Sequence, residues 1–427
     1  MITGTIFDLF VSGTAAESHP CIVQFERDRV RTISRGELFR KVNRLAAGFA
    51  EMGVTHGARV VIMAPDSADW IATALAVIHA GGVVVPLDIQ MGGEELRHVL
   101  DDADPVLVLT SAKLRDRLPP RYAGLTGRVL LLDEFMVNNN GPGAAALSGL
   151  TTAAARPGDV AVIFYTSGTT GPPKGVPLTH RNLASNVKAL CEQGLADQTD
   201  RILVPLPFHH VYPFTVGILI PLTLGATILM PFSLVGPQIV RALREGEATV
   251  MLGVPRLFEE IWNALDKRVQ DRGHFAALAF HGLLLLSMTI HQYTHRQIGR
   301  YLFAGLHRRI GPGLRLMVSG GAALDPTLGR KLQGLGWELA TGYGLTETSP
   351  ILTFNHPERI RLESAGIVLP GVEIAIDASE GPGEVLARGP NVFAGYRNLP
   401  EKSAEALSDD GWFHTGDIGQ LDENGYL

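Results

Sequence analysis

Residues 160–176 read VAVIFYTSGTTGPPKGV. The first six residues are apolar or aromatic and predict a buried strand, and the loop after it carries four hydroxyl side chains, three glycines and Lys174. Glycines let backbone N–H groups approach an anion, hydroxyl groups donate hydrogen bonds, and lysine supplies positive charge. The segment therefore predicts a strand that leads into a polyphosphate-binding loop.

Two other interpretations of this loop are weaker. A Walker A loop needs a second glycine five residues after the first, but the residue five positions after Gly168 is Pro173. A generic polar surface loop is the simpler alternative, yet it does not account for so many donors directly after a buried strand.

The regions around the loop alternate strand-length apolar runs with helix-length segments. Continuous Val, Ile and Leu runs are typical of strands covered on both faces, so the alternation predicts βαβ units. The predicted strands are residues 59–64, 83–87, 105–110, 128–132, 226–230, 248–252 and 314–319, and the predicted helices are 35–52, 68–79 and 93–102.

The predicted fold class is α/β, with two packed βαβ-type lobes of mostly parallel sheet plus a small β-rich lobe. We place the two large lobes in residues 1–352. After residue 352 short strands and turns replace the longer alternation, so residues 353–427 are expected to form the β-rich subdomain.

Composition excludes several classes of protein. The chain has 427 residues with 46% apolar content, enough for more than one core, and its formal net charge of −6 argues against a nucleic-acid partner. Its two cysteines cannot form a disulfide framework, and no secretory signal precedes the first basic residue, Arg27. We therefore expect a cytoplasmic protein, with the inner membrane face as an additional site of contact.

Further motifs follow the loop in order. Residues 319–324 read SGGAAL, 341–347 read TGYGLTE, and 411–417 read GWFHTGD. Together with residues 165–176, they resemble the adenylate-forming superfamily, which includes acyl-CoA synthetases, adenylation domains of peptide synthetases and luciferases. Residues 253–258 (GVPRLF) and the helical segment after them look most like long-chain fatty acyl-CoA synthetases.

The resemblance implies a role for each motif in holding ATP and Mg²⁺. The residues expected around the β- and γ-phosphates are Thr166, Ser167, Gly168, Thr169, Thr170 and Lys174. Thr346 would donate to the α-phosphate, and Glu347 would hold Mg²⁺, which prefers hard oxygen ligands. Taken alone, Glu347 would more simply be a solvated carboxylate.

The same resemblance implies the nucleoside contacts. Tyr343 would stack on the adenine, Gly321 and Ala322 would line its opposite side, and Asp417 would accept both ribose hydroxyls. A core aromatic is the simpler reading of Tyr343 without its neighbours.

His209 and His210 lie in the proline-bounded segment 205–214 (PLPFHHVYPF), which resembles another stretch of the family. The resemblance puts His210 near the carboxylate and α-phosphate, where an imidazole could donate to developing negative charge or move aside to admit substrate. A satisfied core histidine is the alternative.

Residues 202–240 contain no charged side chain. An amino-acid substrate would need a carboxylate here to pair its ammonium group, so an acid with an apolar tail is favoured, against a wall of Val211, Phe214, Ile218 and Leu222. The prolines and glycines of this stretch favour a buried helix and strand over a membrane span.

Between Asp271 and Asp325 there is no carboxylate, whereas six arginines and five histidines occur there. Residues 282–310 are predicted to form an amphipathic helix with a basic face. Such a face could rest on anionic lipid or meet an acidic carrier protein, and a packed helix with a solvated basic edge explains it equally well.

The predicted function is ATP-dependent activation of a fatty acid to an acyl-adenylate, followed by thioester formation with CoA. Alternatives are a fatty acyl-AMP ligase, an acyl-carrier-protein synthetase and, from another class, a catalytically silent ATP- or acyl-binding module. The family's mobile C-terminal domain, with its catalytic lysine, has no match before Leu427. The chain is therefore expected to bind ATP and fatty acid but to adenylate slowly and to transfer little acyl group to thiol.

Overall fold

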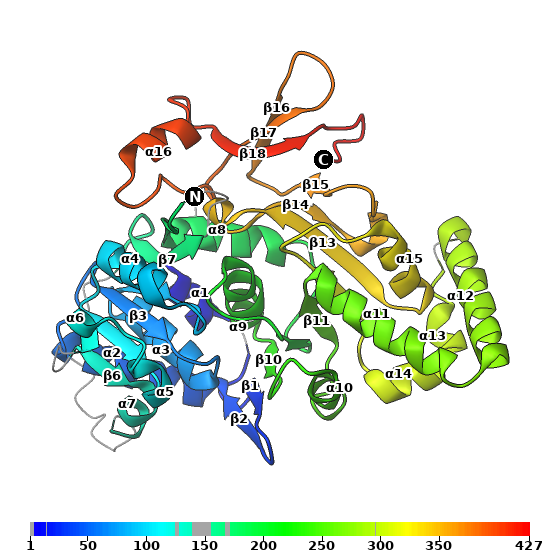
Figure 1. Ribbon diagram of the computed structural model, residues 1–427, viewed down its shortest axis with the longest axis horizontal. Helices are drawn as coiled ribbons and strands as arrows, with labels where there is room; N and C mark the ends of the chain where they lie inside the picture. Colours follow the sequence, from blue (N-terminus) through cyan, green and yellow to red (C-terminus); the bar gives the residue numbers. More distant parts are fainter. Residues whose placement is uncertain (1–3, 14, 124–127, 139–154, 167–170, 295) are drawn as a thin grey trace.

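The computed structural model describes residues 4–13, 15–123, 128–138, 155–166, 171–294 and 296–427. These residues form two large, mostly parallel sheets with helices on both faces and a small antiparallel sheet (Figure 1). The predicted α/β class with two βαβ-type lobes and a β-rich lobe is confirmed.

The first lobe is a six-stranded sheet in the order β6-β5-β3-β4-β7-β8. All neighbouring pairs are parallel except β7 and β8. Val60 and Ile62 face one hydrophobic cluster with helices α2 and α3, and Val61 and Met63 face another with α4, which explains the continuous apolar runs. The elements are α2 (Arg35–Glu51), β3 (Arg59–Met63), α3 (Ala68–His79), β4 (Val83–Pro86), α4 (Gly93–Ala103), β5 (Leu107–Thr110), α5 (Ala112–Arg115), α6 (Pro120–Ala123), β6 (Val129–Leu131), α7 (Leu132–Asn138), β7 (Val160–Thr166) and β8 (Lys174–Thr179).

The second lobe is a nine-stranded sheet in the order β15-β14-β13-β12-β11-β9-β10-β1-β2. Ile202 and Ile228 face the cluster shared with the first lobe, and Leu203 and Leu229 face the cluster under the outer helices. The strands are β1 (Pro20–Phe25), β2 (Val30–Ser34), β9 (Arg201–Leu203), β10 (Thr227–Met230), β11 (Val250–Gly253), β12 (Leu316–Ser319), β13 (Glu338–Gly344), β14 (Ile351–Asn355) and β15 (Ile367–Val368).

The N-terminal hairpin belongs to the second lobe although it precedes the first in sequence. Ile22 of β1 lies opposite Ile228 of β10 in a parallel pair, and β2 completes the edge of the sheet. Because such pairing is made across about 200 residues of chain, local sequence patterns do not reveal it.

The uncharged stretch forms the π-helix η2 (Pro213–Leu219) and α9 (Ile220–Leu224), followed by β10. Phe214 packs edge-to-face on Trp70 and on Phe164 of the first lobe. This helix therefore lies between the two large sheets, next to α1 (Ile6–Ser12) and α8 (His180–Cys191), as predicted for a buried helix and strand (Figure 1).

The outer face of the nine-stranded sheet carries α10 (Gly236–Glu245), α11 (Pro255–Gln270), α12 (His274–Thr294), α13 (Gly299–Leu302), α14 (Ala304–Ile310) and α15 (Pro326–Gly334). The single helix predicted over residues 282–310 is instead distributed over α12, α13 and α14. Helix α13 begins at Gly299, where a Cβ would lie 2.2 Å from the carbonyl oxygen of Gly334, so only glycine permits this close approach of the two backbones.

The small sheet contains β16 (Glu373–Asp377), β17 (Gly383–Arg388) and β18 (Phe413–Gly419), all antiparallel, with α16 (Pro400–Ala406) beside them. Two short helical turns precede it, η3 (Thr346–Thr348) and η4 (Pro357–Arg359). In Figure 1 this sheet lies above the two large lobes.

Candidate active site

The polar segments that the sequence analysis singled out lie where strands end. Thr166 ends β7, Ser319 ends β12, and β13 ends at Gly344, just before η3. Ser319 and Thr341 are register partners in parallel neighbouring strands, so the SGGAAL and TGYGLTE segments leave the sheet side by side. The carboxyl ends of strands in open α/β sheets are where ligands bind.

The base of the predicted phosphate loop is an antiparallel pair in which Thr166 lies opposite Lys174. Both side chains are half-buried. The predicted phosphate-binding residues Ser167, Gly168, Thr169 and Thr170 lie outside the described residues. The strands before and after these residues, β7 and β8, pair with each other and bring Thr166 and Lys174 together at one end of the sheet.

A set of contacts from distant segments fixes this base. The Tyr165 hydroxyl donates a 2.6 Å hydrogen bond to Asp102 Oδ2, and burial raises the pKa of Tyr165, so the phenol keeps its proton. Arg397 Nε donates to the Asp102 carbonyl oxygen at 2.8 Å, and the Arg397 backbone N–H donates to Gly175 O at 2.9 Å. The loop therefore starts and ends on strands that are tied to α4 and to the segment after β17.

Tyr396 contacts both Lys174, which is predicted to bind phosphate, and Glu347, which is predicted to bind the metal ion. Its hydroxyl donates a 2.9 Å hydrogen bond to Glu347 Oε1, and Lys174 Nζ lies 4.8 Å from its ring centroid. Burial raises the pKa of Tyr396, and the Glu347 carboxylate raises it further, so the hydroxyl remains a donor. A cation over an aromatic face is attracted to the ring, so Tyr396 restrains both charged groups.

Glu347 has the chemistry expected of a Mg²⁺ ligand. It is buried, its backbone carbonyl accepts from Phe393 N at 2.8 Å, and Thr346 beside it is half-buried at the start of η3. Among the described residues there is no group of three or more His, Cys, Asp or Glu side chains that could hold a metal ion. A single carboxylate fits Mg²⁺ where phosphate oxygens and water complete the octahedron.

Tyr343 and Asp417, predicted to contact adenine and ribose, lie together. The Tyr343 hydroxyl donates a 2.8 Å hydrogen bond to Asp417 Oδ2 of β18, and burial raises the Tyr343 pKa. Asp417 itself is exposed, as are Gly321 and Ala322 on the neighbouring loop, so these groups remain accessible to a nucleoside.

The segment that carries the two histidines spans both lobes. The Phe208 N–H donates to Asp66 Oδ1 at 3.3 Å in the first lobe, and the Tyr212 hydroxyl donates to Val318 O at 3.0 Å in the second. The Tyr212 ring also lies under Gly320, where a Cβ would be only 2.9 Å from the ring. His210 therefore lies between the end of β3 and the loop after β12.

Both imidazoles are neutral at neutral pH. Burial, reinforced by His210 and opposed by Asp88, lowers the pKa of His209 to about 4. Partial desolvation of the imidazole also lowers the pKa of His210, although the residue is exposed to solvent, and Asp88 acts in the opposite direction. A neutral imidazole can donate one N–H to an oxygen without adding a full positive charge.

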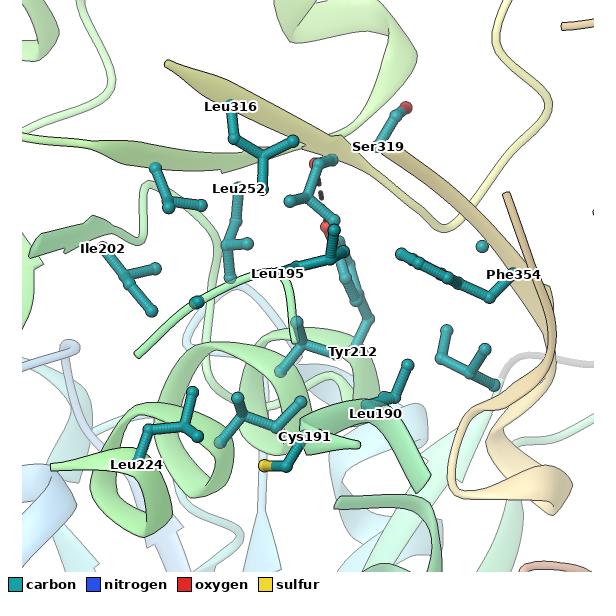
Figure 2. A pocket seen from close by; sticks show the side chains of 17 residues that line it. Leu190, Cys191, Leu195, Ile202, Tyr212, Leu224, Leu252, Leu316, Ser319 and Phe354 are labelled. Carbon is teal, nitrogen blue, oxygen red and sulfur yellow. Dashed lines mark hydrogen bonds between the residues drawn. The ribbon is translucent and has the colours of Figure 1, made fainter. Parts of the chain in front are cut away.

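An apolar cavity adjoins these segments. It lies between α8, η2 and α9 on one side and the nine-stranded sheet on the other, and Figure 2 shows the Tyr212 ring reaching across it toward β12. The cavity volume is about 70 Å³, so the space is a narrow slot. None of its lining residues in the described part of the chain is charged.

The four residues predicted to form a wall for the acid do not line this cavity. Tyr212, Val216, Ile220 and Leu224 line it, whereas Val211, Phe214, Ile218 and Leu222 are buried on the other side of the same helix, in the core shared with the first lobe. The helix is apolar all round, so its pattern could not distinguish the face toward the cavity from the face toward the core.

Sequence reasoning missed Tyr396, Arg397 and Asp102. The segment 391–398 (NVFAGYRN) has neither helical nor strand periodicity, and its side chains act through partners up to 296 residues away. The available signal was the concentration of Asn, Gly, Tyr and Arg in a connecting segment of the region of short strands and turns after residue 352, and connecting segments are a common setting for site residues.

Comparison with known proteins gives consistent matches. The sequence profile of the family described as AMP-binding enzyme matches residues 12–397. Long-chain-fatty-acid–CoA ligase FadD15 of Mycobacterium bovis is 30% identical, over 92% of this chain and 68% of that protein, and malonate–CoA ligase of Arabidopsis thaliana is 30% identical, over 99% and 70%. The crystal structure of ATP-bound MatB from Rhodopseudomonas palustris superimposes with a TM-score of 0.77 at 26% identity, covering 100% of this chain and 78% of that one.

Proposed function

The chain belongs to the AMP-binding enzyme family, and the two relatives named above are acid–CoA ligases. We propose that it activates a carboxylic acid with an apolar tail as an acyl-adenylate. The acyl group would then pass to the thiol of CoA. The relatives differ in the acid that their names give, a long-chain fatty acid or malonate, so the choice of acid has to be argued from this chain's own residues.

The observation that carries the choice is the uncharged cavity. Val318 and Ser319 of β12 and Gly342 of β13 belong both to its wall and to the strands that lead into the predicted nucleotide segments. An acid whose tail occupied the slot would therefore present its carboxylate toward those segments. Apolar walls with a few polar groups at one end are the usual design of small-molecule sites.

The same cavity disfavours a dicarboxylic or amino acid. A second carboxylate or an ammonium group placed among Val216, Leu252 and Leu316 would lose its hydration without gaining a partner among the described lining residues. Ser319 Oγ is buried there with no hydrogen-bond partner in the described part of the chain, so one neutral polar group on the acid could be accommodated.

The reaction requires an acid oxygen to attack the α-phosphorus of ATP. The new bond joins the carboxylate oxygen to that phosphorus, and the bond to the bridging oxygen breaks, so pyrophosphate leaves with its electron pair. Thr166 and Lys174 are assigned to the outer phosphates, Thr346 to the α-phosphate, and Tyr343, Gly321, Ala322 and Asp417 to the nucleoside. Magnesium bound at Glu347 would neutralise phosphate charge, and the protein's part is positioning and electrostatic stabilisation.

His210 is assigned to the meeting point of acid and α-phosphate. Its lowered pKa keeps the ring neutral, so it would not form an ion pair that fixes the incoming carboxylate. An N–H donated to an oxygen of the phosphorus centre would stabilise charge that develops there. Asp66, through the Phe208 N–H, would hold the backbone that carries this ring.

The decisive experiment is acid-dependent exchange of pyrophosphate into ATP. The purified chain is incubated with ATP, Mg²⁺ and labelled pyrophosphate, with saturated acids of increasing length, malonate and an amino acid tested in turn. The proposal expects exchange with the apolar acids and none above background with malonate or the amino acid.

Two outcomes separate the proposal from its alternatives. ATP binding with no exchange for any acid would identify a silent binding module and overturn the enzyme assignment. Exchange with apolar acids would support the enzyme assignment. A panel of CoA and holo-carrier protein as acceptors, run with the family's C-terminal domain restored, would then distinguish a CoA ligase from a fatty acyl-AMP ligase or an acyl-carrier-protein synthetase.

A further inference from the structure

Helix α12 has two apolar faces, and only one of them is used inside the chain. Leu284 and Ser287 are buried against α11 and α15, and a Cβ at Gly334 of α15 would lie 2.5 Å from Met288 Cγ, so this packing is close. By length and composition α12 could cross a membrane, yet only 11% of its apolar stretch is buried inside the protein. Its second face is therefore left to solvent.

The solvent face is a continuous stripe. Its large side chains are Phe275, Leu278, Leu285 and Tyr293, which are 87%, 66%, 66% and 77% exposed, with Leu286 beside Leu285. Their spacing follows the helical period, with Gly282 and Thr289 filling the remaining positions. In Figure 1 α12 stands at the margin of the molecule, and the stripe is not covered by any described element.

Exposed arginines flank α12 and continue onto α14. Arg272 precedes α12, next to the exposed Asp271, and Arg296 follows it. Arg308 and Arg309 are exposed on α14, and Tyr301 is exposed on α13. The sequence contains no Asp or Glu between Asp271 and Asp325. An apolar stripe with exposed aromatic side chains, followed in sequence by exposed arginines, is complementary to a surface that is apolar inside and anionic outside.

We propose that α12, with α13 and α14, docks the chain on an anionic lipid bilayer, lying flat in the interface. The helix does not cross the bilayer, because its other face stays packed on α11 and α15. Phe275, Leu278 and Leu285 enter the headgroup–acyl boundary, and the arginines contact lipid phosphates. This docking goes beyond acid activation and does not depend on it, since the stripe lies on the opposite side of the sheet from the apolar cavity.

A lipid surface accounts for this combination better than a second copy of the chain. Two stripes that met face to face would also bring two sets of arginines together with no carboxylate from the same segment to pair them. Self-association through the stripe is therefore kept as an outcome of the test.

The test is flotation of the chain with vesicles of phosphatidylcholine, with and without 30% phosphatidylglycerol, at low and high salt. The expected result is binding to the anionic vesicles that weakens with salt. The double variant Leu278→Gln/Leu285→Gln should lower the partition coefficient by about tenfold or more, because two leucines lose their burial in lipid. The pair Arg308→Ser/Arg309→Ser should lower it by about fivefold for each arginine on anionic vesicles only.

The matched control is Leu234→Gln/Val235→Gln. These side chains are each 59% exposed but lie before α10, outside the stripe, and should leave vesicle binding unchanged. ATP binding and the thermal unfolding midpoint are recorded for every variant, so that misfolding is recognised.

Three results would overturn the docking proposal: no flotation of the unaltered chain, equal losses from stripe and control variants, or a stripe variant that abolishes a dimer in sedimentation while leaving vesicle binding intact. Because flotation needs neither ATP nor acid, its failure is independent of pyrophosphate exchange, and either proposal can fail alone.

Discussion

The Tyr396 hydroxyl donates a 2.9 Å hydrogen bond to Oε1 of Glu347, across 49 residues of sequence. This contact joins the segment after β17 to the turn η3, and the same tyrosine ring lies beside Lys174. The carboxylate assigned to magnesium is thus oriented before any ligand arrives, and the orienting group comes from a segment that had no assigned role.

Replacing Tyr396 with Phe removes the hydroxyl and leaves the ring next to Lys174. A hydrogen bond to a charged group contributes about 1.5 to 3 kcal/mol, so the KM for magnesium-ATP in pyrophosphate exchange should rise by about tenfold or more. Tyr396→Ala, which also removes the ring, should have the larger effect. Wild-type kinetics in Tyr396→Phe would show that the contact does not orient Glu347.

Glu347→Gln keeps the shape of the side chain and removes its charge. The maximal exchange rate should fall by about a hundredfold, because the assigned metal ligand is lost, while the unfolding midpoint changes little. Titrating Mg²⁺ measures the effect directly, with the exposed Glu401→Gln as a control. An unchanged Mg²⁺ dependence in Glu347→Gln would remove this residue from the metal site.

Asp417 is assigned to the ribose hydroxyls, so replacing it should remove the preference for nucleotides that carry these hydroxyls. The unaltered chain should prefer ATP over 2′,3′-dideoxy-ATP by about tenfold or more, because the hydrogen bonds from both hydroxyls to the charged carboxylate are lost with the analogue. In Asp417→Ala the two nucleotides should perform alike. If the variant retained the full preference, the ribose contact would lie elsewhere.

Val216 lines the narrow slot, so a larger side chain there should limit the length of the acid. Val216→Phe should reduce exchange with long saturated acids by about fivefold or more while short acids are still activated, since the added ring fills space and overpacking costs roughly 1 to 3 kcal/mol. The short acids are the internal control, and an equal loss for all lengths would argue against an acyl slot.

The buried His180 should make the free energy of unfolding depend on pH. It is buried at the start of α8, its Nδ1 accepts from Ile6 N at 3.3 Å, and burial lowers its pKa from 6.5 to about 4. The unfolded chain therefore binds the proton first, and stability falls as pH drops from about 6.5 toward 4, by up to roughly 3 kcal/mol. Between pH 8 and 5, urea unfolding of His180→Gln should lose less stability than the unaltered chain, and parallel curves would contradict this.

The local sequence pattern was sufficient to predict strands that are buried on both faces. The apolar runs at residues 59–64 and 83–87 and the helix at 68–79 were found because both faces of β3 and β4 are covered. The union of β1 with β10 was not found, since strand pairing across the chain leaves no periodic trace in either partner.

Among the predicted site residues, the structure brings Lys174 near Glu347 through Tyr396, and Tyr343 to Asp417. Their ligand roles stay predictions. The face of η2 and α9 toward the cavity could not be predicted, because Phe214 and Val216 are equally apolar and only the position of the neighbouring sheets separates core from cavity.

The N-terminal hairpin has a consequence for how this chain can be divided. Because β1 pairs with β10, a piece that started after residue 58 would expose the apolar edge of Ile228, Leu229 and Met230, an open template for association with other strands. Cutting the chain at a sequence position between the two lobes would therefore separate strands that pair with each other, and it would not yield two independent lobes. The two large sheets are interwoven along the sequence and have to be kept in one piece.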